Sequence, residues 1–403
     1  MIKSESTGQE LRLQPIATVY RTIDQAGPIS RIQLARECLM APGTLTRIAR
    51  LLMDNHLIQE VASQASTGGR RPVSLAINTT ARQLLAVRAG RNHFHMGLCD
   101  LSGKLIKKET VQAFTESEET FSAGLISAMR DFISSNKQHI TALTGVGITL
   151  PGLIDSQAGI VHFMPNISVN RLALAENVRQ ALEIPCYISN DTAAMCLAEH
   201  YFGTATTCNN ALFISIHNGV RAGMMIHGEL YEGCLGAAGE IGHIQVDPLG
   251  QRCYCGNFGC LETLVCNPSI ENRYNQLARN HQPAADAYPS GNKTVADICT
   301  AAVNQEPLAV NILKDVAKHL GNVIAMSVNL IRPEKIILCG EIATAFPIIA
   351  PVIQHCMENG TVQGISRAPA LEISPLGQQR WLGGTALVKR ALRDGSLLGQ
   401  FLD

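Results

Sequence analysis

The 403-residue sequence lacks a net charge, a long apolar run free of charges, and a recognisable signal peptide. Its 33 basic and 33 acidic residues balance, so the overall charge gives no support to nucleic-acid binding, which would require a local basic surface. A transmembrane helix needs about 20 predominantly apolar residues in a row, and the sequence contains no such run. We therefore expect a cytoplasmic protein that does not insert into a membrane.

The thirteen cysteines lack the spacing of a disulfide framework. Their number is odd, and ten of them lie scattered through apolar stretches. Isolated cysteines of this kind are usually buried and reduced, as in proteins of a reducing compartment. We therefore expect no disulfide network.

The remaining three cysteines form a C-x-C-x4-C segment, Cys253, Cys255 and Cys260, and His243 lies ten residues before it. Two intervening glycines allow a short loop to fold around one point. Three thiolates and one imidazole complete a tetrahedral zinc site with no open position, which is typical of structural zinc. The alternative is a loop of small residues with reduced, buried cysteines. We predict a structural Zn²⁺ held by His243, Cys253, Cys255 and Cys260.

The N-terminal segment, from residue 16 to about residue 75, reads as three helices followed by two short strands. Apolar residues in 16–23 recur at helical spacing, and Gly27-Pro28 ends that pattern. Ser30 and Gln33 then form a capping-box sequence, with Ser30 as the N-cap of a second helix that ends near Glu37.

The third helix, predicted over residues 44–52, has two distinct faces. Stepping 100° per residue places Leu45, Ile48, Ala49 and Leu52 on one side. The opposite side is polar and cationic, carries no acid, and suits the major groove of DNA. We expect Thr46, Arg47 and Arg50 to contact the bases there.

Two strand-like pieces, 57–61 and 72–77, are joined by a glycine- and arginine-rich loop. This is the layout of a winged helix-turn-helix, and the loop would be its wing. Arg70 and Arg71 at its tip could enter a narrow minor groove, where the negative potential is strong. A small helical bundle with a solvated basic loop is the alternative. We predict binding to double-stranded operator DNA.

The body of the chain, from about residue 80, alternates short apolar runs with amphipathic helices, which predicts an α/β architecture. Four runs are candidates for buried strands that end in small residues: 84–87, 143–149, 211–216 and 335–340. Glycine-bearing turns follow these strands, where ligand phosphates often bind.

The chain resembles the ROK family of repressors and sugar kinases over essentially its whole length. The segments 151–155 (PGLID) and 239–243 (GEIGH) carry the resemblance, together with the cysteine cluster. The resemblance implies an N-terminal winged helix-turn-helix joined to the two-lobed α/β, actin-like ATPase fold of the ROK sugar kinases. The implied domains are 1–80 for DNA binding, 81–194 with 381–403 for the smaller lobe, and 195–380 for the larger lobe.

The turns that bind ATP phosphates in the family's kinases are altered here. Arg88 replaces the acid of the first turn, 88–92, and the second glycine and the threonine of that turn are also missing. In the second turn, 219–223, the hydroxyl residue is lost and Arg221 replaces a glycine. The third turn is reduced to 339–341. We therefore expect a non-enzyme that does not bind ATP.

The sugar-binding residues of the family are kept. The resemblance assigns hydroxyl contacts to Asn190, Asp191, Glu240, His243 and Glu262, and carboxylates and amides suit vicinal hydroxyls because they accept hydrogen bonds in pairs. Asp191 matches the base that takes the proton from the sugar hydroxyl in the kinases, so residual kinase activity stays open. A helix-capping role is the alternative for Glu262.

The resemblance to the repressor branch implies control of N-acetylglucosamine uptake and catabolism genes, with release from DNA by a sugar phosphate, N-acetylglucosamine 6-phosphate. We expect Arg221 to help bind the phosphate, and a solvent-facing arginine is the alternative. Two other functions stay open: an ATP-dependent sugar kinase with an accessory DNA-binding domain, and a glucose-responsive repressor controlled by protein sequestration.

A single helix-turn-helix reads one half-site, so we expect a homodimer or a dimer of dimers. The amphipathic segment 385–393 near the C-terminus could pack against the DNA-binding domain and couple effector binding to operator release.

Overall fold

The computed structural model describes residues 3–62, 73–90, 92–113, 115–280, 292–362 and 368–401, with the backbone alone for 3–12 and 280. The predicted wing, with Arg70 and Arg71, lies outside these residues. The chain forms two compact units, Met1–Asp191 with Trp381–Asp403, and Thr192–Arg380. The three domains predicted from the sequence stay a proposal, and each compact unit is described by itself below.

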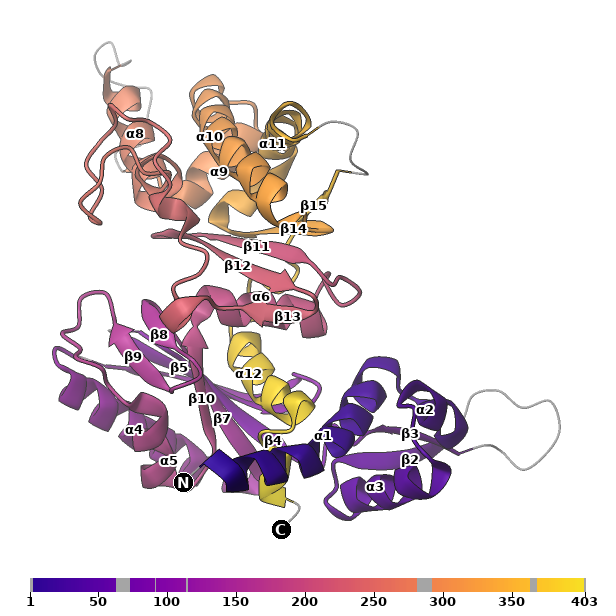
Figure 1. Ribbon diagram of the computed structural model, residues 1–403. Coiled ribbons are helices and arrows are strands. Elements are labelled where there is room, and N and C mark those ends of the chain that lie inside the picture. Colours follow the sequence, from indigo (N-terminus) through magenta and orange to yellow (C-terminus); the bar gives the residue numbers. More distant parts are fainter. Residues whose placement is uncertain are drawn as a thin grey trace. The chain divides into compact units, whose positions relative to one another are not determined.

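The first unit begins with the three predicted helices and two predicted strands, and a short strand, β1, that was not predicted lies between the first two helices (Figure 1). It comprises α1 (Lys3–Ala26), β1 (Ile29–Ser30), α2 (Arg31–Glu37), α3 (Pro42–Asp54), β2 (Ile58–Ala62) and β3 (Val73–Ile77). The strands form an antiparallel sheet in the order β1-β3-β2. Ser30 caps α2 through the predicted box with Gln33. Helix α1 is longer than predicted, because it starts well before the apolar stripe and contains Pro15.

The two faces of α3 are those expected from the sequence. Its four predicted core residues, Leu45, Ile48, Ala49 and Leu52, are buried. They belong to one apolar core with Tyr20 and Ile23 of α1, Leu34 of α2 and Leu75 of β3. Burial of this stripe fixes which side of α3 faces outward.

The rest of the first unit is built on a five-stranded sheet of order β10-β7-β4-β5-β6. Strands β4, β7 and β10 are parallel, whereas β5 and β6 are antiparallel to their neighbours. A short hairpin follows β7. The bounds are β4 (Gln83–Ala89), β5 (His93–Asp100), β6 (Leu105–Gln112), β7 (Leu143–Leu150), β8 (Leu153–Asp155), β9 (Ile160–Phe163) and β10 (Cys186–Asn190).

Both faces of this sheet are covered, which explains why β4 is apolar from Leu84 to Val87. Leu85 and Val87 pack into a core with α4 (Glu118–Ser135) and α5 (Leu174–Leu182). Leu84 and Ala86, pointing the other way, join the core that contains α12 (Trp381–Asp394). The short helices η1 (Lys137–His139) and η5 (Leu398–Phe401) complete the unit.

Helix α12 packs against the winged helix, as expected for the C-terminal segment. Its residues Val388, Ala391 and Leu392 share one core with α1 and α3. Asp24 of α1 is only 5% exposed and forms ion pairs with Lys389 and Arg393 of α12. The N-terminal helices are therefore joined to the sheet by apolar contacts and by a buried charge cluster.

The second unit contains a five-stranded sheet of order β13-β12-β11-β14-β15. Strands β11 and β14 coincide with the predicted apolar runs. The strands are β11 (Ala211–Ile216), β12 (Val220–Ile226), β13 (Glu229–Tyr231), β14 (Lys335–Gly340) and β15 (Ala370–Ile373). The helices are α6 (Asp191–Phe202), α7 (Glu262–Val265), α8 (Asn267–Asn280), α9 (Val295–Val303), α10 (Pro307–Ile331) and α11 (Phe346–Gly360), with η2 (Cys234–Gly236), η3 (Ile241–His243) and η4 (Glu341–Ala345).

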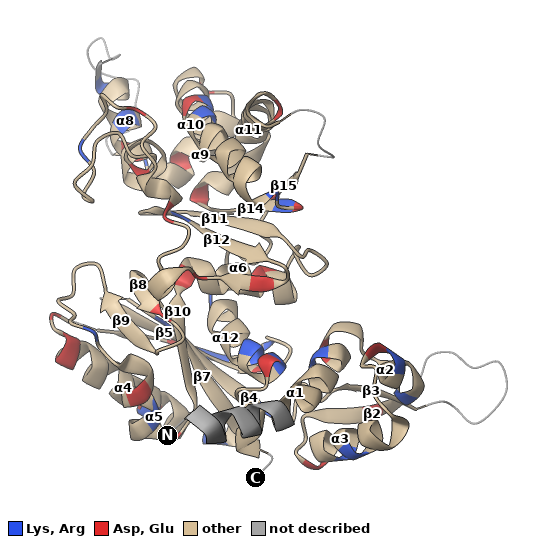
Figure 2. Ribbon diagram, viewed as in Figure 1, with Lys and Arg blue, Asp and Glu red and all other residues tan. Residues whose placement is uncertain are grey.

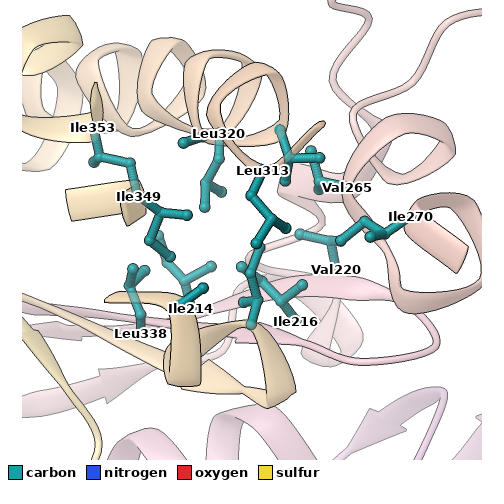
Figure 3. Packing of buried hydrophobic residues seen from close by; sticks show 14 of the residues in the cluster. Ile214, Ile216, Val220, Val265, Ile270, Leu313, Leu320, Leu338, Ile349 and Ile353 are labelled. Atoms are coloured by element: carbon teal, nitrogen blue, oxygen red, sulfur yellow. The ribbon is translucent and has the colours of Figure 1, made fainter. Parts of the chain in front are cut away.

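The core of the second unit lies between this sheet and α10 and α11. Figure 3 shows Ile214 and Leu338 of the sheet facing Leu320 and Ile349 of the two helices. All four side chains are fully buried. No described helix in either unit has the length and apolar character needed to cross a membrane.

Candidate DNA-binding, sugar and metal sites

The outward face of α3 carries the residues predicted to contact DNA. Thr46, Arg47 and Arg50 are all exposed, and the blue bands on the α3 ribbon in Figure 2 mark its basic residues. The Thr46 hydroxyl donates a hydrogen bond to the carbonyl of Pro42 at 2.8 Å, so its oxygen also serves the helix backbone. The two arginines are therefore the stronger candidates, and their contact with bases stays a prediction.

In the first unit, three parallel strands end at one edge of the sheet and bring polar residues together. Arg88 lies near the end of β4, Gly152 just beyond β7, and Asn190 and Asp191 at the end of β10 and the start of α6. The carboxyl ends of parallel strands are the usual position of ligand sites in open α/β sheets.

Hydrogen bonds and an ion pair fix the side chains at this edge. Asn190 is 4% exposed and donates from Nδ2 to the carbonyl of Gly152 at 2.9 Å. Gly152 has a φ of +114°, and a side chain there would meet the carbonyl of Phe163. Asp191 Oδ2 lies 3.5 Å from Nη2 of Arg88. Asp191, which is predicted to contact the sugar, thus lies in direct contact with the altered phosphate turn.

The predicted metal ligands lie together in the second unit. One ligand atom from each of His243, Cys253, Cys255 and Cys260 lies within 4.8 Å of the others. His243 Nδ1 is 3.5 Å from Cys253 Sγ, and Cys255 Sγ is 3.7 Å from Cys260 Sγ. Zinc–sulfur bonds of about 2.3 Å would place tetrahedral ligands roughly 3.8 Å apart, so the four side chains fit a zinc ion.

The backbone around the cluster depends on two glycines. Gly256 and Gly259 have φ values of +96° and +60°. A side chain at Gly259 would overlap the carbonyl of Asp247. Burial raises the pKa of the Cys260 thiol to about 12, so its proton must leave when a metal binds. Glycine at these positions lets the loop bring its three cysteines to one point.

His243 has a different neighbour on each ring nitrogen. Nδ1 faces the cysteine cluster, whereas Nε2 lies 3.0 Å from the hydroxyl of Tyr254 and 4.0 Å from Oε2 of Glu240. Tyr254 is 77% exposed. A metal on Nδ1 would fix the tautomer of the ring and leave Nε2 directed toward polar groups.

Arg221 is held by several groups of the same unit. Nη1 forms a 2.8 Å ion pair with Oε1 of Glu240, and Nη2 donates to the carbonyls of Gly236 and Ala238 at 2.7 and 3.1 Å. Its side chain is only 12% exposed, so the alternative of a solvent-facing arginine is wrong. Phosphate binding by Arg221 stays a prediction, and it would require the guanidinium to exchange these partners.

Glu262 is 8% exposed at the start of α7. Its Oε2 accepts a hydrogen bond from the backbone N–H of Val220 at 2.8 Å, and burial raises the pKa of this carboxyl group. One oxygen therefore supports the backbone of β12, and α7 has no side-chain cap. A role of Glu262 in sugar binding stays a prediction.

A residue just before the second altered turn contacts the third altered turn, an interaction that sequence reasoning missed. His217 Nδ1 lies 2.7 Å from Oε2 of Glu341, and Asn267 donates to the same oxygen at 2.8 Å. Sequence reasoning also missed the pairing of Arg88 with Asp191 and the position of Tyr254. The unusual Arg88 was a signal, but its partner lies 103 residues away.

Comparisons with known proteins agree with this arrangement. The sequence profile of the ROK family matches residues 84–391. The chain belongs to the ROK family. It is 39% identical to the DNA-binding transcriptional dual regulator NagC of Escherichia coli K12, over 96% of this chain and 95% of that protein. The equally similar protein of Escherichia coli O157:H7 is named N-acetylglucosamine repressor.

Two solved ROK structures bear on the fold. A ROK family transcriptional regulator, described as a homolog of the E. coli Mlc protein, superposes with a TM-score of 0.91 and 36% identity, covering 98% of this chain and 99% of that one. A ROK hexokinase from Thermus thermophilus superposes with a TM-score of 0.62 and 24% identity, covering 76% and 97%. The predicted fold, a winged helix-turn-helix on a two-lobed ROK sugar kinase body, is confirmed.

Proposed function

We propose that this protein is a DNA-binding transcriptional repressor of genes for amino-sugar uptake and catabolism. Its similarity to N-acetylglucosamine repressors over nearly the whole chain is the observation that carries the proposal. The outward arginines of α3 supply the local basic surface that a chain of zero net charge needs. The proposed effector that releases the protein from DNA is N-acetylglucosamine 6-phosphate.

The proposed hydroxyl contacts are those that the family resemblance implies: Asn190, Asp191, Glu240, His243 and Glu262. Their oxygen and nitrogen atoms match the donors and acceptors of a sugar ring. An unpaired buried partner costs about 1–3 kcal/mol, so such a set selects among sugars. Arg221 would act at the phosphate or, as its ion pair suggests, by holding Glu240 in place.

The proposed cofactor is a structural Zn²⁺ on His243, Cys253, Cys255 and Cys260. Four protein ligands leave no coordination position for a substrate, so the ion would supply rigidity rather than Lewis-acid chemistry. His243 would join the metal loop to the sugar site through its second ring nitrogen. Zinc would thereby support both the fold of the loop and the effector response.

We propose that the protein acts in the cytoplasm as a homodimer or a dimer of dimers and does not transfer phosphate. The reduced cysteines and the DNA target support that compartment. A sugar kinase is the second candidate, because Asp191 matches the family's base. It is disfavoured by the ion pair that already engages this carboxylate and by the altered phosphate turns 88–92, 219–223 and 339–341.

Thermal-shift titration with N-acetylglucosamine 6-phosphate, N-acetylglucosamine, glucose 6-phosphate and ATP tests the proposal. We expect stabilisation by the phosphorylated amino sugar and none by ATP, since a ligand stabilises only the state it binds. A coupled assay for ATP-dependent phosphorylation of N-acetylglucosamine and glucose tests the kinase. Turnover above about 1 per second would show that the protein is a sugar kinase and would contradict the repressor proposal.

A further inference from the structure

Arg88 carries a positive charge to the sheet edge where the family's kinases have an acid. It lies on β4, in register with His95 of β5 and Thr149 of β7. This central position fixes its backbone, while the guanidinium reaches Asp191. The two side chains are 28% and 29% exposed, so a small ligand has access to both.

The chemistry of the proposed effector makes this charge necessary. Asp191 matches the base that faces the hydroxyl phosphorylated by a kinase. In a sugar 6-phosphate that hydroxyl is replaced by a phosphate ester, which carries close to two negative charges at neutral pH. Beside an unshielded carboxylate such a group would be repelled. A cation at this point is therefore needed for binding.

We propose that Arg88 binds the phosphate of the effector, an inference that rests on the proposed function. The guanidinium exchanges its single 3.5 Å contact with Asp191 for paired hydrogen bonds to phosphate oxygens. Arginine suits this exchange because its five N–H donors match carboxylate and phosphate geometry equally well.

The contact also explains how phosphorylation would be sensed. An unphosphorylated sugar offers Arg88 no anion, so the arginine stays with Asp191. A phosphorylated sugar supplies a stronger acceptor in the same place. Arg88 thus discriminates the 6-phosphate from the free sugar, whereas the hydroxyl contacts recognise both.

Calorimetric titration of the full-length protein with N-acetylglucosamine 6-phosphate and with N-acetylglucosamine tests this inference. We expect Arg88→Gln to weaken binding of the 6-phosphate at least tenfold and to leave binding of the free sugar within about threefold. Arg88→Lys should retain part of the affinity for the 6-phosphate. Arg179→Gln, which breaks an exposed ion pair with Glu176 on α5, is the matched control and should change neither affinity.

The double variant Arg88→Gln/Asp191→Asn separates direct binding from mere shielding of Asp191. If Arg88 binds phosphate directly, affinity for the 6-phosphate stays low in the double variant. Recovery to the wild-type value would overturn the inference, as would a single Arg88→Gln variant that binds the 6-phosphate as tightly as wild type. Failure of the wild-type protein to bind the 6-phosphate would instead overturn the proposed effector.

Discussion

Arg88 and Arg221 both occupy altered phosphate turns and both pair with an acid, yet they are anchored differently. Arg88 makes one long contact with Asp191, and both side chains are more than a quarter exposed. Arg221 is 12% exposed and binds Glu240 together with two backbone carbonyls. An arginine in each altered turn therefore gives one weakly held cation, Arg88, and one firmly held cation, Arg221. Anchoring, rather than residue type, separates a ligand contact from a positioning residue.

The largest effect is expected from removing a zinc ligand near the Arg221–Glu240 ion pair. Cys260→Ser removes a fully buried ligand, so we expect loss of bound zinc and a fall in the free energy of unfolding of at least about 4 kcal/mol. Elemental analysis and urea unfolding measure both. Cys234→Ser, at an exposed cysteine outside the cluster, is the control and should change neither. Retention of zinc by Cys260→Ser would exclude the proposed ligand set.

The cluster of Asp24, Lys389 and Arg393 between α1 and α12 is a buried set of ion pairs with which the Arg88 and Arg221 pairs can be compared. Asp24→Asn leaves Lys389 and Arg393, 13% and 10% exposed, without their carboxylate. Breaking such a buried pair should cost about 3 kcal/mol, measured by urea unfolding. Asp54→Asn, at an exposed acid at the end of α3, should cost less than about 0.5 kcal/mol. Equal costs for the two variants would show that the cluster contributes little.

Arg221→Met tests the ion pair between Arg221 and Glu240 directly. Because Glu240 is 41% exposed, we expect a loss of only about 1–2 kcal/mol in unfolding free energy. Affinities for N-acetylglucosamine and its 6-phosphate should fall by the same factor, since Glu240 is displaced for both. Arg273→Met, in a more exposed pair of the same unit, is the control. If Arg221→Met weakened binding of the 6-phosphate but not of the free sugar, Arg221 rather than Arg88 would be the residue that contacts the phosphate.

Tyr254→Phe is the smallest perturbation of the second unit. It removes the hydroxyl 3.0 Å from His243 Nε2, and the exposed position predicts a stability change within about 0.5 kcal/mol. If Nε2 serves a sugar hydroxyl, removing this competing partner should leave the sugar affinity unchanged or raise it up to about fivefold. Calorimetric titration measures this change. A tenfold fall would make Tyr254 itself a sugar contact.

Local patterns were sufficient to predict much of the fold. The Ser30 capping box, the two faces of α3 and four apolar strands depend on residues close in sequence, and each is present in the structure. The spacing of three cysteines also predicted a cluster whose atoms do converge. The early start of α1 was missed, because residues 3–15 carry no clear apolar stripe.

Contacts between distant elements could not be predicted from such patterns. The pairing of Arg88 with Asp191 depends on the strand order β10-β7-β4, which places the ends of separate strands at one edge. The partners of Arg221 likewise depend on how η2 and the following loop fold back onto β12. Sequence comparison identified these arginines as unusual, but only their surroundings distinguish their roles.

Release from DNA tests the central claim most directly. A duplex selected by repeated binding from a random pool would serve as operator, and fluorescence anisotropy would follow its complex with the full-length protein. The account predicts that N-acetylglucosamine 6-phosphate releases the duplex, that N-acetylglucosamine does not at equal concentration, and that Arg88→Gln removes the difference. Equal release by both sugars from the wild-type protein, or by neither, would contradict it.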